Sequence, residues 1–421
     1  MRHSSEGQAL PYISPDYTPA DSTMRPLLLS GFGTSLRVNG HVLEVTNAEN
    51  HREAFVAHQL PFDSVVVEGN TGMISFEAAR FLAVHDIPVT FLRWDGSVLS
   101  TLLPRGPVAG KLKLAQFASH NDSRKRIEVA RAILEVKLSK SVELLRFLSR
   151  YYPCDAKPVE SEVKRGPSAA AIPDLMGWEG RTAVAYWVEF AKVVNCLWPE
   201  ARFVTRKGKG KSWAQSATDP VNAILNFGYS LLEGRVRHAA NSVGLEPSVG
   251  WLHETAASKL PVVYDLQEPF RWLVDLSVIE TIAGRQLDRK QDLITTENYH
   301  IRLRPRAIGL FAERLSVNFN RAVPFGGQRR TFDAILFETA RKLARHLLGQ
   351  SKRLDLNFPF GAFDGGLDSE AAETISALSY AEARKLGISK AGLWDMKRRA
   401  AEGKPLRLYG KVARRLRAVE S

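Results

Sequence analysis

The sequence has 421 residues and a formal net charge of +13, from 58 Lys and Arg against 45 Asp and Glu. This charge predicts an acidic partner such as double-stranded DNA, and the length predicts two or three domains. Cys154 and Cys196 are too few for a disulfide framework or a cysteine-rich zinc site, and every apolar stretch falls short of the roughly 20 residues of a membrane span. We therefore expect a cytoplasmic protein without a membrane segment.

The first part of the chain predicts a leader and a small sheet domain. Residues 1–24 are polar, contain Pro11, Pro15 and Pro19, and lack the apolar core of a signal peptide, so we expect a disordered leader. Residues 25–108 then read as β-rich, with a tight turn at Asn39-Gly40. Strand-like runs occur at 27–29, 35–38, 42–45, 65–67 and 89–92, with a short helix at 75–84. A domain of this kind suits dimerisation or positioning.

Helical periodicity dominates residues 109–360. A long helix is expected around 127–147, and a polar segment at 155–168 should link it to the next helix. That next helix opens at Pro173-Asp174 and places Glu179 on its apolar face, so the carboxylate should point inward and need a cation or a proton. A further helix should begin at Pro220, with Asp219 as its N-cap.

A glycine-rich basic segment precedes Asp219. It carries the cationic side chains Arg206, Lys207, Lys209 and Lys211. Two interpretations are equally open: a loop that contacts DNA phosphates, and a loop that is merely solvated.

The segment 361–421 changes character. After a glycine-rich linker, we expect a helix from Ser369 to Lys385, a turn over 386–389, and a second helix from Lys390 to Ala401 capped by Ser389. This spacing is similar to a helix-turn-helix, and the segment is strongly basic. Its candidate DNA contacts are Lys397, Arg398 and Arg399. The alternative is a basic helical hairpin that does not read DNA.

Three positions spread over ninety residues carry the candidate chemistry: Glu179, His253 and Glu268. Two carboxylates and one imidazole form a mixed oxygen and nitrogen donor set that suits Mg²⁺ or Mn²⁺ better than a structural zinc ion. A hard divalent ion within a basic protein is what phosphodiester chemistry on a nucleic acid requires.

Each of these residues also has a structural interpretation. Glu179 could form an ion pair with Arg181, and His253 could be a hydrogen-bonded core residue. Asp265 and Glu268 have the spacing of a capping box, with Asp265 as the N-cap. Spacing alone cannot bring Glu179 to His253, because that step depends on the fold.

Several motifs occur in an order that is specific to one family. They are 66–70, 87–92, Met176–Gly180, Asp219–Tyr229, Gly244–Pro247, Gly250–His253 and Asp265–Arg271. On these motifs, residues 25–360 resemble the CRISPR-associated integrase family, the nuclease of spacer acquisition, and its relatives the casposon integrases.

The resemblance implies an α+β fold, in which a β-rich dimerisation domain at 25–108 precedes a larger all-helical catalytic domain at 109–360 and the helix-turn-helix-like module. It implies a homodimer in which Glu179, His253 and Glu268 bind Mg²⁺ or Mn²⁺. Asp265 would support the site, and Arg271 would orient a carboxylate or contact phosphate, unless it forms only a structural ion pair.

The implied activity is that of a metal-dependent DNA endonuclease and integrase, which joins DNA 3′-hydroxyl ends to a target by transesterification. Spacer integration in CRISPR adaptation, with a small dimeric adaptation protein as partner, is the first expectation. The C-terminal module resembles that of casposon integrases, which act on terminal inverted repeats, so that role is the alternative. A DNA-binding regulator without catalysis is a third hypothesis.

Overall fold

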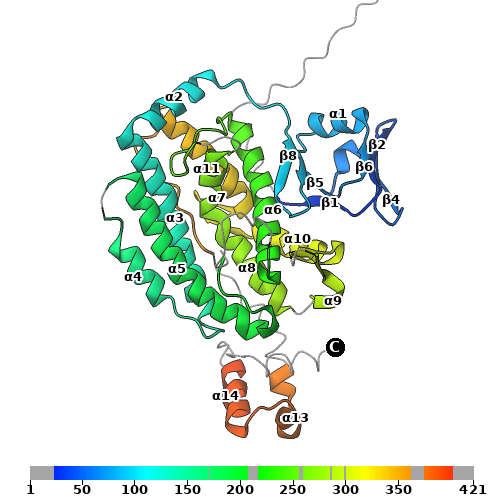
Figure 1. The fold of residues 1–421 in the computed structure, drawn as a ribbon, viewed down its shortest axis with the longest axis vertical. Helices are drawn as coiled ribbons and strands as arrows, with labels where there is room; N and C mark the ends of the chain where they lie inside the picture. The colour runs from blue at the N-terminus through cyan, green and yellow to red at the C-terminus, as the bar shows by residue number, and fades with distance from the viewer. Residues whose placement is uncertain are drawn as a thin grey trace, which may run out of the picture.

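The structure is a computed structural model that describes residues 23–168, 170–206, 217–255, 259–284, 287–297, 300–361 and 374–401. Strands fill the N-terminal part, a larger helical body follows, and the short helices of residues 374–401 lie apart from the main body (Figure 1). The expected α+β organisation, with an N-terminal sheet region and a larger helical part, is therefore confirmed. No helix of the described residues is long and apolar enough to cross a membrane.

The N-terminal part contains two four-stranded sheets. The first sheet has the strand order β1 (Pro26–Ser30), β5 (Ser64–Glu68), β7 (Val89–Leu92) and β8 (Val98–Leu102). The second sheet has the strand order β4 (Arg52–Val56), β3 (Val42–Thr46), β2 (Thr34–Asn39) and β6 (Gly72–Ile74). All five predicted strand runs are present. The strands β4, β6 and β8 were not predicted, because they are short or largely exposed and lack an apolar run.

The local signals in this part behave as expected. Asn39 pairs with Val42 across an antiparallel hairpin, and Gly40 takes a positive φ of 61° in the turn. The helix α1 (Phe76–Val84) follows Ser75, whose hydroxyl accepts a hydrogen bond from the Ala78 amide. The two sheets and α1 share one apolar core, built from Leu29, Leu36, Leu43, Val65, Leu82 and Val89 among others.

The helical body begins after β8. Its long helices are α2 (Gly110–Asn121), α3 (Ser123–Leu148), α5 (Ile172–Leu197), α6 (Pro220–Val243), α8 (Arg271–Ala283), α10 (Pro305–Phe319) and α11 (Phe332–Leu347). Its shorter helices are α4 (Lys157–Arg165), α7 (Pro261–Gln267) and α9 (Arg289–Asp292). The helical body also contains the 3₁₀ turns η2 (Pro199–Ala201) and η3 (Glu268–Phe270), and the sheet region contains η1 (Ala57–Gln59).

Two expectations for this part were wrong. The body is not all-helical, because it contains the hairpins β9 (Leu293–Thr295) with β10 (Ile301–Leu303) and β11 (Ala322–Phe325) with β12 (Gln328–Thr331). The polar segment at 155–168 is not a plain linker either, since it forms α4. Val159 gives α4 a buried anchor, and the carbonyl of Glu162 accepts a hydrogen bond from the Trp178 indole.

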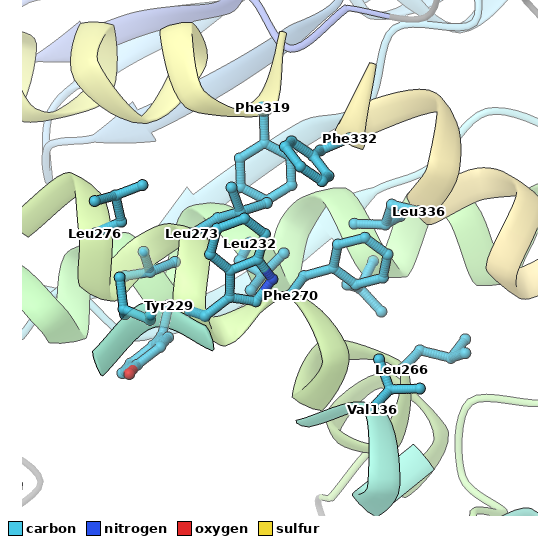
Figure 2. Close-up of a cluster of buried hydrophobic side chains, with 14 of the residues drawn as sticks. Val136, Tyr229, Leu232, Leu266, Phe270, Leu273, Leu276, Phe319, Phe332 and Leu336 are labelled. Carbon is cyan, nitrogen blue, oxygen red and sulfur yellow. The ribbon is translucent and has the colours of Figure 1, made fainter. Parts of the chain in front are cut away.

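The core of the body forms around α6, which is buried along most of its length. Figure 2 shows Tyr229 and Leu232 of this helix among the aromatic and aliphatic side chains of neighbouring elements, including Phe270, Phe319 and Phe332. At Gly228 a Cβ atom would lie 2.6 Å from Val274 Cγ1 and 2.7 Å from Phe311 Cζ, so glycine is what allows α8 and α10 to approach α6 this closely. This core supports the segment that carries Glu268.

A buried ion-pair cluster joins the sheets to the helical body. The Arg235 guanidinium of α6 donates to Asp333 at 2.6 and 2.5 Å, and to the Thr23 carbonyl at 3.1 Å. It also reaches Asp63, just before β5, at 3.4 Å. The adjacent Met24 is buried, and its amide donates to Asn320. The predicted leader 1–24 therefore ends in two residues that pack against the body, while 1–22 lie outside the described residues.

Near the C-terminus, the structure describes residues 374–401 of the predicted module. Residues 374–377 are helical, followed by α13 (Tyr380–Lys385) and α14 (Lys390–Ala401). The single helix expected from Ser369 to Lys385 is wrong, because Ser379 ends the first turn and forms a capping box with Glu382 that starts α13. The expected start of α14 is confirmed: Ser389 Oγ accepts from the Gly392 amide. These helices have their own small core.

Candidate active site

Glu179 lies on α5 and faces α3. Its Oε1 atom is 2.6 Å from the ammonium nitrogen of Lys137, and its side chain is 21% exposed. Arg181 does not pair with it, since that guanidinium donates to the Glu162 carboxylate and to the Gly166 carbonyl. The predicted inward carboxylate is therefore neutralised by a cation, although not by the arginine considered from the sequence.

Glu268 begins the 3₁₀ turn η3 between α7 and α8, and its side chain is only 3% exposed. Its Oε2 lies 2.6 Å from Lys137 Nζ, and its Oε1 lies 3.0 Å from Arg271 Nε. Burial opposes ionisation of this carboxyl, but the positive charges of Arg271 and Lys137 outweigh burial and hold its pKa at about 2. Glu268 is therefore a carboxylate throughout the ordinary pH range.

His253 follows α6 in a loop that Asp265 holds in place. The imidazole Nδ1 lies 2.7 Å from Asp265 Oδ1, and its Nε2 lies 4.0 Å from Glu268 Oε1. With Nδ1–H donated to a carboxylate, the Nε2 lone pair is left on the side of Glu268. Asp265 thereby supports the imidazole, in line with the supporting position that the resemblance implies for it.

The capping-box interpretation of Asp265 and Glu268 is wrong. The helix α7 starts at Pro261 with Leu260 at its N-cap, so Asp265 lies inside the helix. Its buried carboxylate instead accepts hydrogen bonds from the backbone amides of residues 251–253, at 2.6, 3.1 and 3.1 Å. Gly250 permits this contact, since a Cβ there would lie 2.6 Å from Asp265 Oδ2.

Lys137 is the residue of this site that sequence reasoning missed. It lies on α3, where Ile133, Lys137, Lys140 and Leu144 recur at helical spacing on the buried side. Burial disfavours its charged form, but Glu268 and Glu179 outweigh burial and raise its pKa. A lysine within the apolar stripe of a helix was the available signal, because a buried ammonium needs carboxylate partners.

The donor atoms suit a hard divalent ion in their chemistry. Among the described residues, no three His, Cys, Asp or Glu side chains form a ready coordination sphere, and the Lys137 ammonium lies between the two carboxylates. Glu268 Oε2 is buried and, apart from this ion pair, has no hydrogen bond of good geometry within the described part of the chain. Two carboxylate oxygens, one of them without a directional partner, and one imidazole nitrogen fit Mg²⁺ or Mn²⁺.

A second buried network lies behind Arg271. Asp275 of α8 accepts hydrogen bonds from the hydroxyls of Tyr186 at 2.7 Å and Tyr229 at 2.5 Å. The guanidinium of Arg271 stacks on the Tyr229 ring with 4.8 Å between carbon Cζ and the ring centroid. The network therefore fixes the side chain that pairs with Glu268.

Burial of Asp275 gives a testable pH dependence. Burial raises its pKa to about 6, despite hydrogen bonds from Tyr186 and Tyr229 that oppose the rise. Because the folded carboxyl holds its proton more tightly than the unfolded one, stability falls as pH rises from about 4 to about 6, by about 3 kcal/mol. We expect the difference in unfolding free energy between wild type and Asp275→Asn, from urea titrations, to change over this interval. A difference that is constant with pH would contradict this.

The other predicted DNA contacts fall into two groups. The Arg206 guanidinium is engaged inside the protein, because it donates to Asn222 and stacks on Tyr229 at 5.1 Å. Lys207, Lys209 and Lys211 lie outside the described residues. On α14, Lys397 donates to the Ser376 carbonyl, Arg398 is exposed and pairs with Asp395, and Arg399 is partly exposed.

Known sequences match most of this chain. The family model described as CRISPR associated protein Cas1 matches residues 27–316. The CRISPR-associated endonuclease Cas1 1 of Archaeoglobus fulgidus is 26% identical over 347 residues, covering 77% of this chain and 97% of the relative. The CRISPR-associated endonuclease Cas1 2 of Rhodospirillum rubrum is 30% identical over 337 residues, covering 75% of this chain and 93% of the relative.

Solved structures give the same result. A casposase bound to its integration product is 32% identical, with a TM-score of 0.74, and the match covers 84% of this chain and 100% of that chain. A CAS1 protein from Thermotoga maritima, 21% identical with a TM-score of 0.65, shares the fold over 78% of this chain and 98% of its own. The matched family segment contains Glu179, His253 and Glu268, and the chain belongs to the CRISPR-associated Cas1 family.

Proposed function

We propose that this protein is a divalent-metal-dependent DNA endonuclease and integrase that joins DNA 3′-hydroxyl ends to a target. The observation that carries the proposal is the convergence of Glu179 and Glu268 on one cation position, with the His253 imidazole 4.0 Å from Glu268. The net charge of +13 favours a polyanionic substrate. Curated relatives named endonucleases support the cleavage half, and the casposase bound to its integration product supports the joining half.

Glu179, His253 and Glu268 would hold the Mg²⁺ or Mn²⁺ ion. When bound, the ion would polarise the phosphodiester and stabilise charge on the leaving oxygen. Asp265 fixes the orientation and tautomer of the imidazole through Nδ1. Arg271 keeps Glu268 ionised and adds a fixed positive charge beside the site. Water or a DNA 3′-hydroxyl would be the nucleophile, so the reaction needs no covalent protein–DNA intermediate.

Spacer integration in CRISPR adaptation is the role that the curated relatives favour, since they are CRISPR-associated endonucleases. A small dimeric adaptation protein would be the partner in this role. Casposon integration is the second candidate, because the casposase matches over its whole length at 32% identity.

A strand-transfer assay with the purified full chain tests both roles. Short prespacer duplexes with a repeat-containing target, and duplexes ending in terminal inverted repeats, are supplied with Mn²⁺, Mg²⁺ or a chelator, with and without the adaptation partner. Metal-dependent joining of the first substrate supports adaptation, and joining of the second supports casposon mobilisation. If neither is cut or joined, the catalytic proposal fails and the DNA-binding regulator remains.

The N-terminal sheets are the proposed homodimer surface. The edge strand β6 leaves Met73 43% exposed. Phe76, two residues after β6, is 87% exposed, and Phe32, just before the neighbouring strand β2, is 74% exposed. Large apolar side chains exposed at a sheet edge are typical of a surface that another chain covers.

The helices α13 and α14 are the proposed duplex-binding module. Trp394 is 65% exposed on α14, and the Arg398 guanidinium stacks on its ring at 5.1 Å. Leu393 is the buried residue of α14 and packs with Ala383 of α13 and with Leu386 and Ile388 of the turn. An exposed aromatic and cationic face on the second helix of such a pair suits the DNA major groove.

We expect Trp394→Ala and Arg398→Ala each to weaken duplex binding by the full chain about tenfold at fixed salt, because each removes one DNA contact. Fluorescence anisotropy of a labelled duplex measures this. Trp94→Ala is the matched control, since Trp94 also stacks with an arginine, Arg302, but lies in the N-terminal part. Equal affinities in the α14 variants and the control would contradict the module.

A further inference from the structure

The side chain of Lys137 occupies the point where Glu179 and Glu268 meet. Its ammonium nitrogen lies 2.6 Å from Glu179 Oε1 and 2.6 Å from Glu268 Oε2, and it reaches both from a third element, α3. We propose that Lys137 is an internal counter-cation that holds the metal-free site together, and that a divalent ion must displace its ammonium in order to bind. This inference rests on the metal site proposed above. It means that Lys137 controls how tightly that site binds a divalent ion.

The charges explain why such a cation is needed. Glu268 is 3% exposed and Glu179 is 21% exposed, and both carboxylates approach one point. Without a positive charge between them, a buried and a mostly buried carboxylate repel each other and are costly to desolvate. Lys137 supplies that charge with a side chain that is itself only 17% exposed.

The distances do not allow the Lys137 ammonium and a metal ion to lie between the two carboxylates at the same time. Mg²⁺ and its analogues bind carboxylate oxygens at about 2.0–2.2 Å, and Lys137 Nζ lies 2.6 Å from the same two oxygens. A divalent ion at this place would lie too close to the ammonium, with strong charge repulsion. Lysine has a flexible four-carbon stem, so its head can withdraw while α3 stays in place.

Lys140, one turn further along α3, shows what a purely structural lysine looks like here. It is 1% exposed, but its ammonium pairs with Glu143 of its own helix at 2.6 Å and lies over the Phe358 ring at 5.1 Å. Lys140 therefore contacts none of the proposed metal ligands, whereas Lys137 bridges two of them. The two lysines form a matched pair for experiment.

The test compares Mn²⁺ affinity in the full chain, measured by electron paramagnetic resonance of the free ion. Lys137→Met should bind Mn²⁺ about tenfold or more tightly than wild type, because the competing charge is gone. Lys140→Met should bind within about twofold of wild type, and Lys137→Arg should not bind more tightly. Without metal, Lys137→Met should melt about 5 °C lower or more, and Mn²⁺ should raise its melting temperature further than that of wild type.

Unchanged or weaker Mn²⁺ affinity in Lys137→Met, with binding abolished in Glu268→Gln, would overturn the role of Lys137 and leave the proposed metal site intact. Absence of Mn²⁺ binding in both wild type and Lys137→Met would overturn the metal site and this inference together. If Lys137→Met does not fold, Lys137→Gln, which keeps a neutral hydrogen-bond donor, decides the question by the same measurement.

Discussion

Glu268→Gln should lower single-turnover strand transfer by about 10³-fold or more, because a neutral amide replaces the more deeply buried of the two proposed carboxylate ligands. The same loss is expected for His253→Ala and for Glu179→Gln. Duplex binding should stay within about threefold of wild type, since phosphate contacts elsewhere supply most of that affinity. Joining is measured with labelled 3′ ends in Mn²⁺, and binding by anisotropy.

Glu143→Gln is the control for this experiment. Glu143 also pairs with a buried lysine of α3, at 2.6 Å, but contacts none of the three proposed ligands. Its removal should leave strand transfer within a few-fold of wild type, as is usual for groups outside the reacting centre. Full activity in Glu268→Gln would remove this residue from the mechanism, while an equal loss in Glu143→Gln would indicate general damage to α3.

Arg235→Met should destabilise the protein by about 3–5 kcal/mol, the largest stability loss that we expect from one substitution. It leaves Asp333, which is fully buried, and Asp63, which is mostly buried, without their shared cation. Urea titration at neutral pH measures the change. A second substitution, Asp333→Asn, should recover part of the loss, because it removes one of the unpaired charges.

Arg237→Met, two residues further along α6, is the comparison. Its partner is Glu233 on the same helix at 2.5 Å. Both side chains are more exposed than those of Arg235 and Asp333 (17% and 15% against 5% and 0%), so we expect a smaller loss of stability. Similar losses of unfolding free energy in the two arginine variants would contradict this prediction. They would show that α6 tolerates neither change and that the contacts of Arg235 with Asp333 and Asp63 do not stabilise the protein more than an ordinary ion pair.

The sequence predicted the elements whose signals are local. Alternating or β-branched runs identified five strands, Asn39-Gly40 identified a hairpin, and Ser75, Asp219 and Ser389 marked helix starts that the structure confirms through their hydrogen bonds. These signals depend on a few neighbouring residues, so they survive without knowledge of the fold. The strands β4 and β6 are short and largely exposed, without a run of alternating or β-branched residues, and they gave no such signal.

The candidate site was predictable in its acids and imidazole but not in its cation. Family motifs singled out Glu179, His253 and Glu268, whereas Lys137 lies on α3 outside every motif and meets them only through the packing of α3 against α5 and η3. The capping-box interpretation failed for the same reason. Asp265 and Glu268 have the right spacing, but tertiary contact with the loop at 251–253 takes up the Asp265 carboxylate.

The small apolar core of the C-terminal helices is separate from the core of the main body. Its buried members Ile375, Leu378, Ala383, Leu386, Ile388 and Leu393 all come from within residues 374–401. Because the described members of this core all come from one segment, the segment could be exchanged as a unit, like a cassette. Recombination in a gene could replace such a cassette, and with it the DNA-binding surface proposed above, while the residues of the proposed active site, between 137 and 271, stay as they were.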